Sequence, residues 1–345
     1  MWKCELGSAK LGLMKIIIFI TVLALPAAAL AEAPRFSLPI ACALGQDCAI
    51  QNYVDTDPGP QWKDYRCGAM SYDGHDGTDF RIADLEMMRA GVPVLAAADG
   101  MVLRVRDGMA DGVYRQGSNT IPDNAACGNG VIIDHGGGWT TQYCHLRKNS
   151  LAVRPDEPVK RGSLLGLVGQ SGRAQVPHVH FEVAVNGKSV DPFTADGNRE
   201  ATIPACGTTH AGLWRDDVAR ALPYRAPLVL NTGFAAGSIA MEDIETRART
   251  IARLLPDTPA LVFYGRAIGT SEGDTQRITI TAPDGSVFAS HTTDPEPRPR
   301  AQAMAFTGRK RPASGWQDGV YTARYRIIRD RAVIAERTES ITLGE

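Results

Sequence analysis

Short apolar segments separated by glycine-rich turns dominate residues 71–195. These segments are 92–97, 101–105, 131–133, 140–143, 164–168 and 179–185. No helical pattern of 10–15 residues separates them, which favours antiparallel strand pairing over alternating strands and helices. The pattern therefore predicts a mainly β domain built on an antiparallel sheet.

One hairpin can be placed within this domain. Residues 131–134 and 139–143 are predicted to be strands on either side of the turn 136–138, which consists of three glycines. Cys127 and Cys144 then lie near the open end of the hairpin, and we expect them to form a disulfide. The preceding stretch, 107–130, is long, polar and without strand pattern, and loops of this length are usually functional or mobile.

The pattern changes after Cys206. Candidate strands follow at 228–230, 260–264, 277–281, 320–328 and 332–341, with turn signals at 283–285 and 294–299. Short strands at such spacing predict a C-terminal β-sandwich-like domain. Residues 241–255 fit either one amphipathic helix or a charged strand pair. No binding motif indicates what this domain does, so its role is unknown.

The N-terminus resembles a secretory signal peptide. Lys15 precedes an apolar run over 16–25, and small residues end in Ala29-Leu30-Ala31, which predicts cleavage before Glu32. The apolar run is shorter than the ~20 residues of a membrane-spanning helix. We therefore expect a secreted or periplasmic protein with no stable membrane anchor after cleavage.

The predicted organisation has five parts. They are a signal peptide (1–31), a disulfide-pinned lead-in (32–70), the first β domain (71–205), a linker (206–220) and a β-rich accessory domain (221–345). The lead-in is treated as irregular because it shows little periodicity.

Cysteine usage supports export. The chain has seven cysteines, of which Cys4 lies in the leader. The other six are an even number, which in an exported protein implies up to three disulfides. Six cysteines allow 15 pairings, and the sequence does not choose among them. The six are Cys42, Cys48, Cys67, Cys127, Cys144 and Cys206.

Composition excludes several classes of protein. Apolar residues make up 44% and charged residues 22% of the chain, which is typical of a globular protein and not of a disordered or multi-span membrane protein. The 37 basic and 38 acidic residues give a net charge of −1. A nucleic-acid-binding protein would normally carry a basic excess, so we expect no nucleic-acid partner.

Histidines concentrate in the first β domain. Five of the seven histidines lie between residues 75 and 180. His178 and His180 share one face of a strand, and His75 and Asp79 also share a face if their segment is extended. Two imidazoles and a carboxylate are a typical ligand set of catalytic zinc, which leaves a fourth position for water. Each pair alone is weak evidence, because a half-buried strand can hold histidines as ordinary core residues.

The order of these segments resembles the lysostaphin/LytM-type zinc metallopeptidases, which cut peptide bonds in peptidoglycan. That family shows a His-x-x-x-Asp pair, a hairpin ending in Tyr-x-His-Leu, and a Pro-His-x-His-Phe-Glu strand. This chain has His75 and Asp79, Tyr143–Leu146 and Pro177–Glu182, followed by Asp191-Pro192. The match runs in order through about 120 residues, roughly a third of the chain.

The resemblance implies roles for individual residues. His75, Asp79 and His180 match the ligands of one zinc ion in the catalytic domain. His145 and His178 match the two catalytic histidines that do not bind the metal. Which of the two acts as base and which stabilises the oxyanion is left open.

Other polar residues have weaker assignments. Glu182 lies on the same strand face as His180 and is either a partner of that ligand or a surface carboxylate. His135 matches no ligand position, and we expect a structural role. Cys144 precedes His145, and a disulfide is favoured over a thiolate ligand. His210 and His291 lie outside the resemblance.

The implied function is that of an exported zinc endopeptidase acting on peptidoglycan stem peptides or cross-links, with peptidoglycan as the partner. One alternative is a non-catalytic LytM-like scaffold that activates other cell-wall hydrolases. Another is a zinc peptidase that acts on proteins, because the site residues define the chemistry and not the substrate.

Overall fold

The computed structural model describes residues 32–343 except 116, 118, 119, 196, 198–202 and 209–211. The predicted signal peptide, Cys4 and His210 lie outside the described residues. Within the described part of the chain, no helix is long and apolar enough to cross a membrane.

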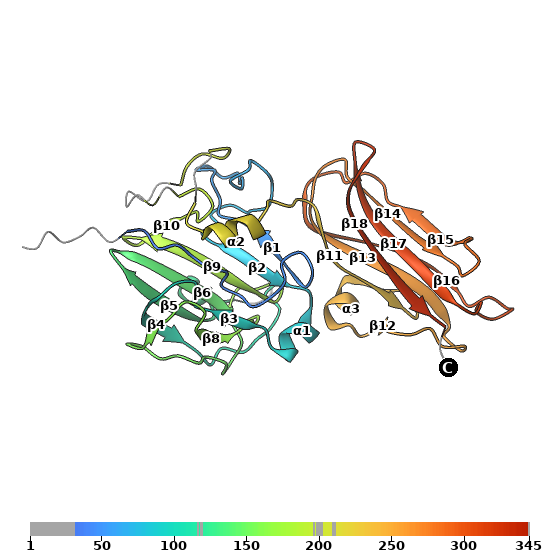
Figure 1. Ribbon diagram of the computed structural model, residues 1–345, viewed down its shortest axis with the longest axis horizontal. Coiled ribbons are helices and arrows are strands. Elements are labelled where there is room, and N and C mark those ends of the chain that lie inside the picture. Colours follow the sequence, from blue (N-terminus) through green and yellow to red (C-terminus); the bar gives the residue numbers. More distant parts are fainter. Residues whose placement is uncertain are drawn as a thin grey trace, which may run out of the picture. The chain divides into compact units, whose positions relative to one another are not determined.

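The first domain is built on an antiparallel sheet, as the sequence predicts (Figure 1). Two of its neighbouring strands carry Asp79 and His180 of the sequence-based assignment. In spatial order the strands are β1 (Cys48–Asn52), β2 (Thr78–Ile82), β9 (His178–Val185), β6 (Trp139–Leu146), β5 (Asn129–Gly136), β4 (Gly100–Arg106) and β7 (Pro158–Val159). Strand β10 (Lys188–Val190) pairs with β9, and β3 (Pro93–Leu95) and β8 (Leu164–Leu167) form a separate pair.

Alternation along β9 separates the core from the opposite face of the sheet. Val179, Phe181 and Val183 are fully buried in the hydrophobic core of this domain, whereas His178 and His180 project from the other face. Because the period of a strand is two, the same residues that fill the core place both histidines together.

The lead-in contributes more than the sequence indicates. Its strand β1 forms one edge of the main sheet and pairs antiparallel with β2, so that Asn52 lies opposite Asp79. Nearly all of β1 is buried, which explains why it shows no alternation of apolar and polar residues. A bulge between Ile50 and Asn52 shifts the register of this pair.

Three disulfides connect the six cysteines of the described chain. They are Cys42–Cys48, Cys67–Cys206 and Cys127–Cys144. The last confirms the pairing expected from the hairpin β5–β6. Cys67–Cys206 joins the lead-in to a segment 139 residues further along the chain.

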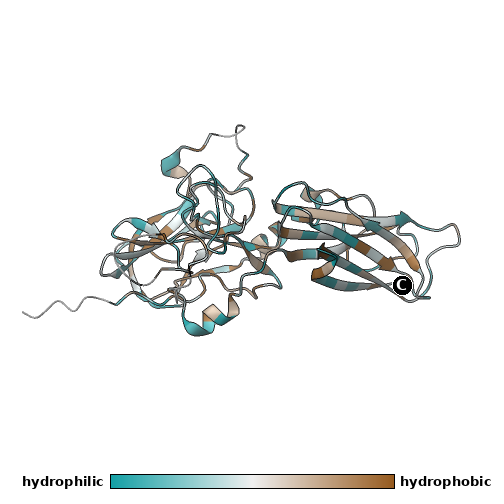
Figure 2. Ribbon diagram, turned by 90° about the horizontal axis from the view of Figure 1, so that it is seen from above, coloured by the Kyte–Doolittle hydropathy of each residue, from teal (hydrophilic) through white to brown (hydrophobic). Residues whose placement is uncertain are grey.

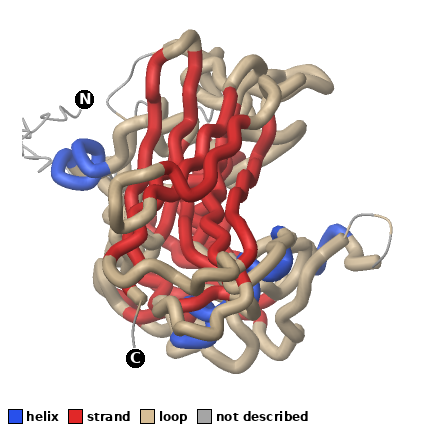
Figure 3. Tube along the Cα trace, turned by 90° about the vertical axis from the view of Figure 1, so that its right-hand side faces the viewer, coloured by secondary structure: helices blue, strands red, loops and turns tan. Residues whose placement is uncertain are grey.

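Helices are few and short, and strands and loops make up most of the structure (Figure 3). The first, α1 (Leu85–Ala90), is capped by Asp84, whose side chain accepts from the backbone N–H of Met87. The others are the 3₁₀ turn η1 (Asp123–Ala125), α2 (Asp216–Ala221) and α3 (Met241–Thr246). At six residues or fewer, none is long enough to give a helical sequence pattern.

The C-terminal part consists of two four-stranded antiparallel sheets, which confirms the predicted sandwich-like architecture. Hydrophobic and hydrophilic residues alternate along these strands (Figure 2), and the hydrophobic side chains form the core of this part. One sheet has the order β12 (Thr250–Ile251), β11 (Leu228–Ala235), β13 (Ala260–Thr270) and β16 (Arg300–Lys310). The other has the order β15 (Val287–Thr292), β14 (Thr275–Thr281), β17 (Val320–Arg329) and β18 (Ala332–Thr342).

Two C-terminal strands were not predicted. Strand β16 turns the small side chains of Ala303 and Ala305 toward the interior, which gives a weak hydrophobic signal. Strand β15 buries only Ala289 fully. Residues 241–255 contain both a helix, α3, and a short strand, β12, so neither single interpretation of that segment is complete.

Candidate active site

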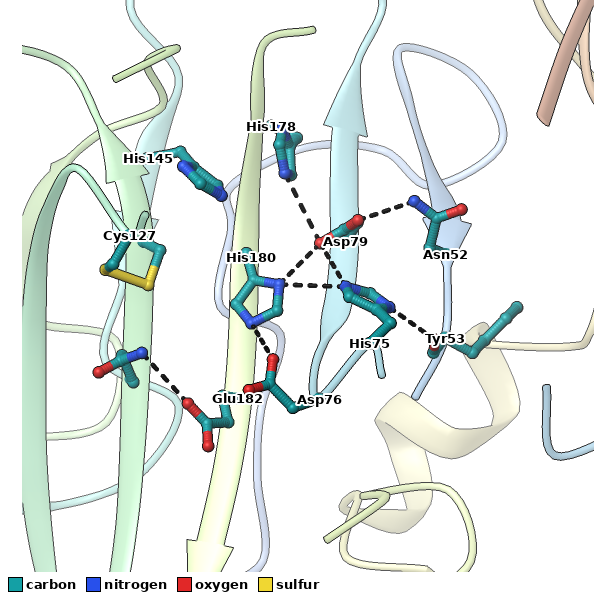
Figure 4. A network of polar contacts seen from close by, with 12 residues as sticks. Asn52, Tyr53, His75, Asp76, Asp79, Cys127, His145, His178, His180 and Glu182 are labelled. Atoms are coloured by element: carbon teal, nitrogen blue, oxygen red, sulfur yellow. Dashed lines mark hydrogen bonds and ion pairs between the residues drawn. A yellow bond between two sulfur atoms is a disulfide. The ribbon is translucent and has the colours of Figure 1, made fainter. Parts of the chain in front are cut away.

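The three predicted ligands converge on one face of the sheet (Figure 4). Asp79 on β2 and His180 on β9 are direct cross-strand partners, and His75 lies in the turn before β2. Asp79 Oδ1 lies 3.2 Å from His75 Nε2 and 3.0 Å from His180 Nδ1. The two histidine nitrogens lie 3.2 Å apart. The three side chains are buried.

This triangle fits a tetrahedral zinc ion. Zinc–nitrogen and zinc–oxygen bonds of about 2.0–2.2 Å at tetrahedral angles separate neighbouring ligand atoms by about 3.3 Å. The observed separations of 3.0–3.2 Å are close to this value. Residues His75, Asp79 and His180 therefore form a donor set of the size and chemistry that zinc requires.

Strand β1 and the residue after it hold two of these side chains in place. His75 Nδ1 donates to the carbonyl oxygen of Tyr53 at 2.7 Å, which leaves Nε2 as the nitrogen that faces the triangle. Asn52 Nδ2 donates to Asp79 Oδ2 at 2.8 Å, so that Oδ1 stays directed at the histidines. The sequence analysis missed both contacts, because only the pairing of β1 with β2 brings Asn52 to Asp79.

His145 and His178 lie beside the triangle, with their ring centroids 4.6 Å apart. His145 Nδ1 donates to the carbonyl oxygen of Ser171, and His178 Nδ1 donates to that of Val176, each at 2.8 Å. Both rings therefore keep Nε2 as the proton-accepting nitrogen. His178 Nε2 lies 3.6 Å from Asp79 Oδ1, which places it next to the ligand set.

His145 also has an unusual backbone. Its φ of 63° lies in the left-handed region, which costs a non-glycine residue on the order of 1–3 kcal/mol. The hydrogen bond from its backbone N–H to Cys127 O, at 2.8 Å, and the adjacent Cys127–Cys144 disulfide hold this conformation. Strain of this kind is typical of a functional position.

Burial and charge pull the pKa values of the site in opposite directions. Burial alone would raise the pKa of Asp79, but the neighbouring imidazoles hold it well below its ordinary value. Burial would lower the pKa of His180, but hydrogen bonds with Asp76 and Asp79 outweigh burial and raise it to about 10. The site thus attracts positive charge, and a bound metal would replace the proton of His180.

The two remaining histidines of the site behave differently. Burial lowers the pKa of His145 well below its ordinary value, and the charges of His178 and His180 lower it further. Burial also lowers the pKa of His178, although Asp79 opposes this shift. Both imidazoles are therefore neutral near pH 7.

The outer nitrogen of His180 contacts a carboxylate that the sequence analysis did not select. His180 Nε2 lies 3.3 Å from Asp76 Oδ1. Glu182, the predicted candidate, instead accepts hydrogen bonds from Ser189 Oγ at 2.6 Å and Gln142 Nε2 at 3.1 Å. Asp76 lies one residue after a ligand, and nothing in the sequence distinguishes it from an ordinary turn residue.

The other histidines of the described chain lie outside the cluster. His135 contacts the carbonyl oxygen of Asp99 through Nδ1 and the hydroxyl of Thr141 through Nε2, in agreement with the structural role expected for it. His291 is exposed on β15 in the C-terminal sandwich. Cys144 is engaged in a disulfide and offers no thiolate.

An antiparallel β domain with a buried His-Asp-His cluster on one face of its sheet defines a metallopeptidase-like class of protein. The particular family follows from comparison with known proteins. Residues 73–192 match the model of Peptidase family M23, so this segment of the chain is similar to an M23 peptidase domain. The matched segment contains all five predicted site residues.

Curated relatives match over little more than a third of the chain. The chain is 32% identical over 130 residues to the peptidoglycan DD-endopeptidase ShyA of Vibrio cholerae, a match that covers 38% of this chain and 25% of ShyA. It is 33% identical over 121 residues to the DD-carboxypeptidase/endopeptidase Mpg of Neisseria meningitidis, covering 35% of this chain and 22% of Mpg. The chain thus spans about a quarter of the length of these relatives.

Two solved structures are also similar to part of the chain. A zinc-containing peptidase from Vibrio cholerae is 28% identical, with a TM-score of 0.33 over 49% of this chain and 41% of that one. The catalytic domain of the prophage-encoded M23 protein EnpA from Enterococcus faecalis is 24% identical, with a TM-score of 0.31 over 48% of this chain and 98% of that one.

Proposed function

We propose that the protein is an exported zinc-dependent endopeptidase that hydrolyses peptide bonds in peptidoglycan stem peptides or cross-links. The convergence of His75 Nε2, Asp79 Oδ1 and His180 Nδ1 to within 3.0–3.2 Å carries this proposal. The names of the relatives ShyA and Mpg support peptidoglycan as the substrate.

In this proposal His75, Asp79 and His180 hold one zinc ion. When bound, such an ion polarises the scissile carbonyl and lowers the pKa of a coordinated water toward ~7.

The two neutral histidines supply the proton transfers. With Nδ1 fixed by a backbone carbonyl, Nε2 of His145 or His178 is free to accept the proton of the attacking water. The same nitrogen then holds a proton that it can give to the leaving amine. The second imidazole can donate to the oxygen that becomes negative as the carbonyl is attacked once its Nε2 has taken up a proton from solvent. The two histidines act as a pair.

Cysteine chemistry supports export. All six cysteines of the described chain are paired in disulfides, which form and persist in oxidising compartments. The predicted signal peptide fits the same compartment, and we propose that the protein acts in the periplasm or outside the cell.

Two alternatives differ in chemistry or in substrate. A non-catalytic scaffold would not need a complete ligand set, and the set in this chain is complete, which counts against it. A peptidase that acts on proteins would share the site, so digestion of peptidoglycan beside unfolded protein substrates separates that alternative.

The proposal is tested by replacing His180 with Ala, with the exposed His291→Ala as a matched control. Purified proteins are incubated with cell-wall sacculi, and released muropeptides are identified by mass spectrometry. We expect cleavage at a peptide bond by the wild type and by His291→Ala, and none by His180→Ala. Undiminished release by His180→Ala would overturn the assignment.

A further inference from the structure

A polar pocket of about 330 Å³ lies on the same sheet as the candidate active site. Arg104 and Arg106 of β4 line it, together with Asp123 and Asn124 of the loop between β4 and β5. Gly130 of β5 and Gln142 of β6 also contribute to its surface. Neither the zinc-binding triangle nor the histidine pair uses these residues.

Gln142 connects the pocket to strand β9, which carries His178 and His180. This side chain lines the pocket and donates to Glu182 Oε2 at 3.1 Å. Glu182 lies two residues beyond the ligand His180 on β9 (Figure 4). The Cys127–Cys144 disulfide lies between the two sites, because Cys127 lines the pocket and Cys144 is the cross-strand partner of His180.

Strand register gives the distance between them. Going across the sheet, β9 is followed by β6, β5 and β4, so three strand spacings separate His180 from the arginines. At about 4.8 Å per spacing this is about 14 Å. An extended peptide rises about 3.3 Å per residue, so a substrate residue about four positions from the scissile bond would reach the pocket.

The charges of the pocket are not balanced. Within the described part of the chain, neither Arg104 nor Arg106 forms an ion pair, and both are exposed. Arg106 Nη2 donates to the carbonyl oxygen of Asn124 at 2.7 Å, which fixes its position without neutralising it. The one carboxylate that lines the pocket, Asp123, is paired with Arg173 at 2.7 Å.

Gly130 leaves the base of the pocket without a side chain. A Cβ at Gly130 would come within 2.9 Å of Cys127 Sγ and 2.6 Å of Tyr143 O. The disulfide therefore packs directly against the backbone of β5 and leaves no side chain to fill the space beneath the arginines. The two guanidinium groups have no acidic partner, and Gly130 adds no side chain to the pocket. Such an arrangement suits a planar anion such as a carboxylate.

We propose that this pocket is a subsite that binds a free carboxylate of the peptide substrate, about four residues from the bond that is cut. The subsite rests on the proposed peptidase function and adds to it the requirement for an acidic substrate strand. Asp123, Asn124, Cys127 and Gly128 form one wall of this subsite, and the disulfide ties Cys127 to β6.

The test uses the double variant Arg104→Gln/Arg106→Gln and two soluble cross-linked muropeptides. One muropeptide has free carboxylates, and the other has them converted to carboxamides. We expect the wild type to show a KM about 10- to 100-fold lower for the free carboxylate, as charge-assisted hydrogen bonds allow. The double variant should lose this preference, with kcat within about twofold of the wild type. Arg154→Gln, whose side chain is 87% exposed, is the control and should keep the preference.

Each outcome decides the proposal. Equal KM values for both muropeptides in the wild type, or an unchanged preference in the double variant, would overturn the subsite and leave the peptidase function standing. Failure of the wild type to cleave either muropeptide or sacculi would overturn both. Retained kcat in the double variant excludes misfolding as the cause of a raised KM.

Discussion

Two buried clusters of charged groups lie side by side on strand β2, two residues apart. Asp79 belongs to one and Arg81 to the other, and the alternation of the strand directs both to the same face of the sheet. Asp79 meets His75, His178 and His180. Arg81 donates hydrogen bonds to Gln51, Gln302 and Glu245. The last two belong to the C-terminal part of the chain.

The Arg81 cluster pairs opposite charges. Glu245 of α3 accepts hydrogen bonds from both Arg81 and Arg266, and Arg266 also donates to the carbonyl oxygen of Ala83. Gln302 of β16 accepts a further hydrogen bond from Arg81 at 2.9 Å. Both arginines are fully buried, so these contacts link the main sheet to the C-terminal strands.

The Asp79 cluster consists mainly of imidazole groups. Three imidazoles surround a single carboxylate, and their inward nitrogens compete for it. A cation completes such a set, whereas the Arg81 cluster already holds two cations on one carboxylate. The contrast teaches that burial and charge alone do not mark a functional site. A set of potential metal-ligand atoms that converges on one point does.

The largest expected effect comes from Asp79→Ala. Removing a partner outside a ligand set typically costs 10–100-fold in metal affinity or activity. We therefore expect loss of a ligand to cost about 10³-fold or more in muropeptide release, together with loss of bound zinc. Elemental analysis and sacculus digestion on the same sample measure both. Zinc retained at one equivalent by the folded variant would contradict the ligand assignment.

Breaking the other cluster should affect stability and not chemistry. Glu245→Ala leaves Arg81 and Arg266 buried without a counter-charge, which costs about 3–5 kcal/mol of unfolding free energy. Denaturant unfolding measures the loss, and Glu242→Ala, an exposed change on the same helix, is the control. We expect zinc content to be unchanged under native conditions. If both variants were equally stable, the paired cluster would not hold the sheet and the sandwich together.

Another buried carboxyl group belongs to neither cluster. Asp191 is fully buried, and burial raises its pKa to about 7. Because the folded-state pKa lies above the unfolded value of 3.9, folding favours the protonated form, and stability falls as pH rises from about 4 to about 7. The slope reaches at most about 1.4 kcal/mol per pH unit.

Asp191→Asn should flatten this part of the stability profile. The amide oxygen can still accept the hydrogen bond from the backbone N–H of Phe193, so the local turn is kept. Urea unfolding of both proteins from pH 4 to pH 8 gives the difference directly. Parallel profiles would show that Asp191 is ionised in the folded protein.

The smallest effects come from two adjacent residues of β1. Asn52 supports Asp79 at 2.8 Å, and Gln51 supports Arg81 at 2.7 Å, because the bulge in β1 brings both side chains to β2. We expect Asn52→Ala to weaken zinc affinity about 10- to 100-fold. Gln51→Ala should leave zinc affinity unchanged and cost about 1 kcal/mol of stability. Competition with a chelator measures the affinity, and equal affinities in the two variants would remove the distinction between the clusters.

The resemblance to LytM-type peptidases implied the five candidate site residues, and much of the sheet could be predicted because regular alternation places residues two apart on one face. His178 and His180 follow directly from this rule. Asn52, Tyr53 and Asp76 could not be found, because their roles depend on which strand pairs with β2 and on how one turn folds. The Arg81–Glu245 contact joins residues 164 positions apart, and nothing in the local sequence connects them.

The most direct test of the account is X-ray absorption at the zinc edge of the purified protein. The account predicts one zinc ion per chain with nitrogen and oxygen donors at about 2.0–2.2 Å, supplied by His75, Asp79 and His180. It also predicts no sulfur donor, because all described cysteines are in disulfides. A zinc–sulfur distance of about 2.3 Å, or the absence of stoichiometric zinc, would contradict it.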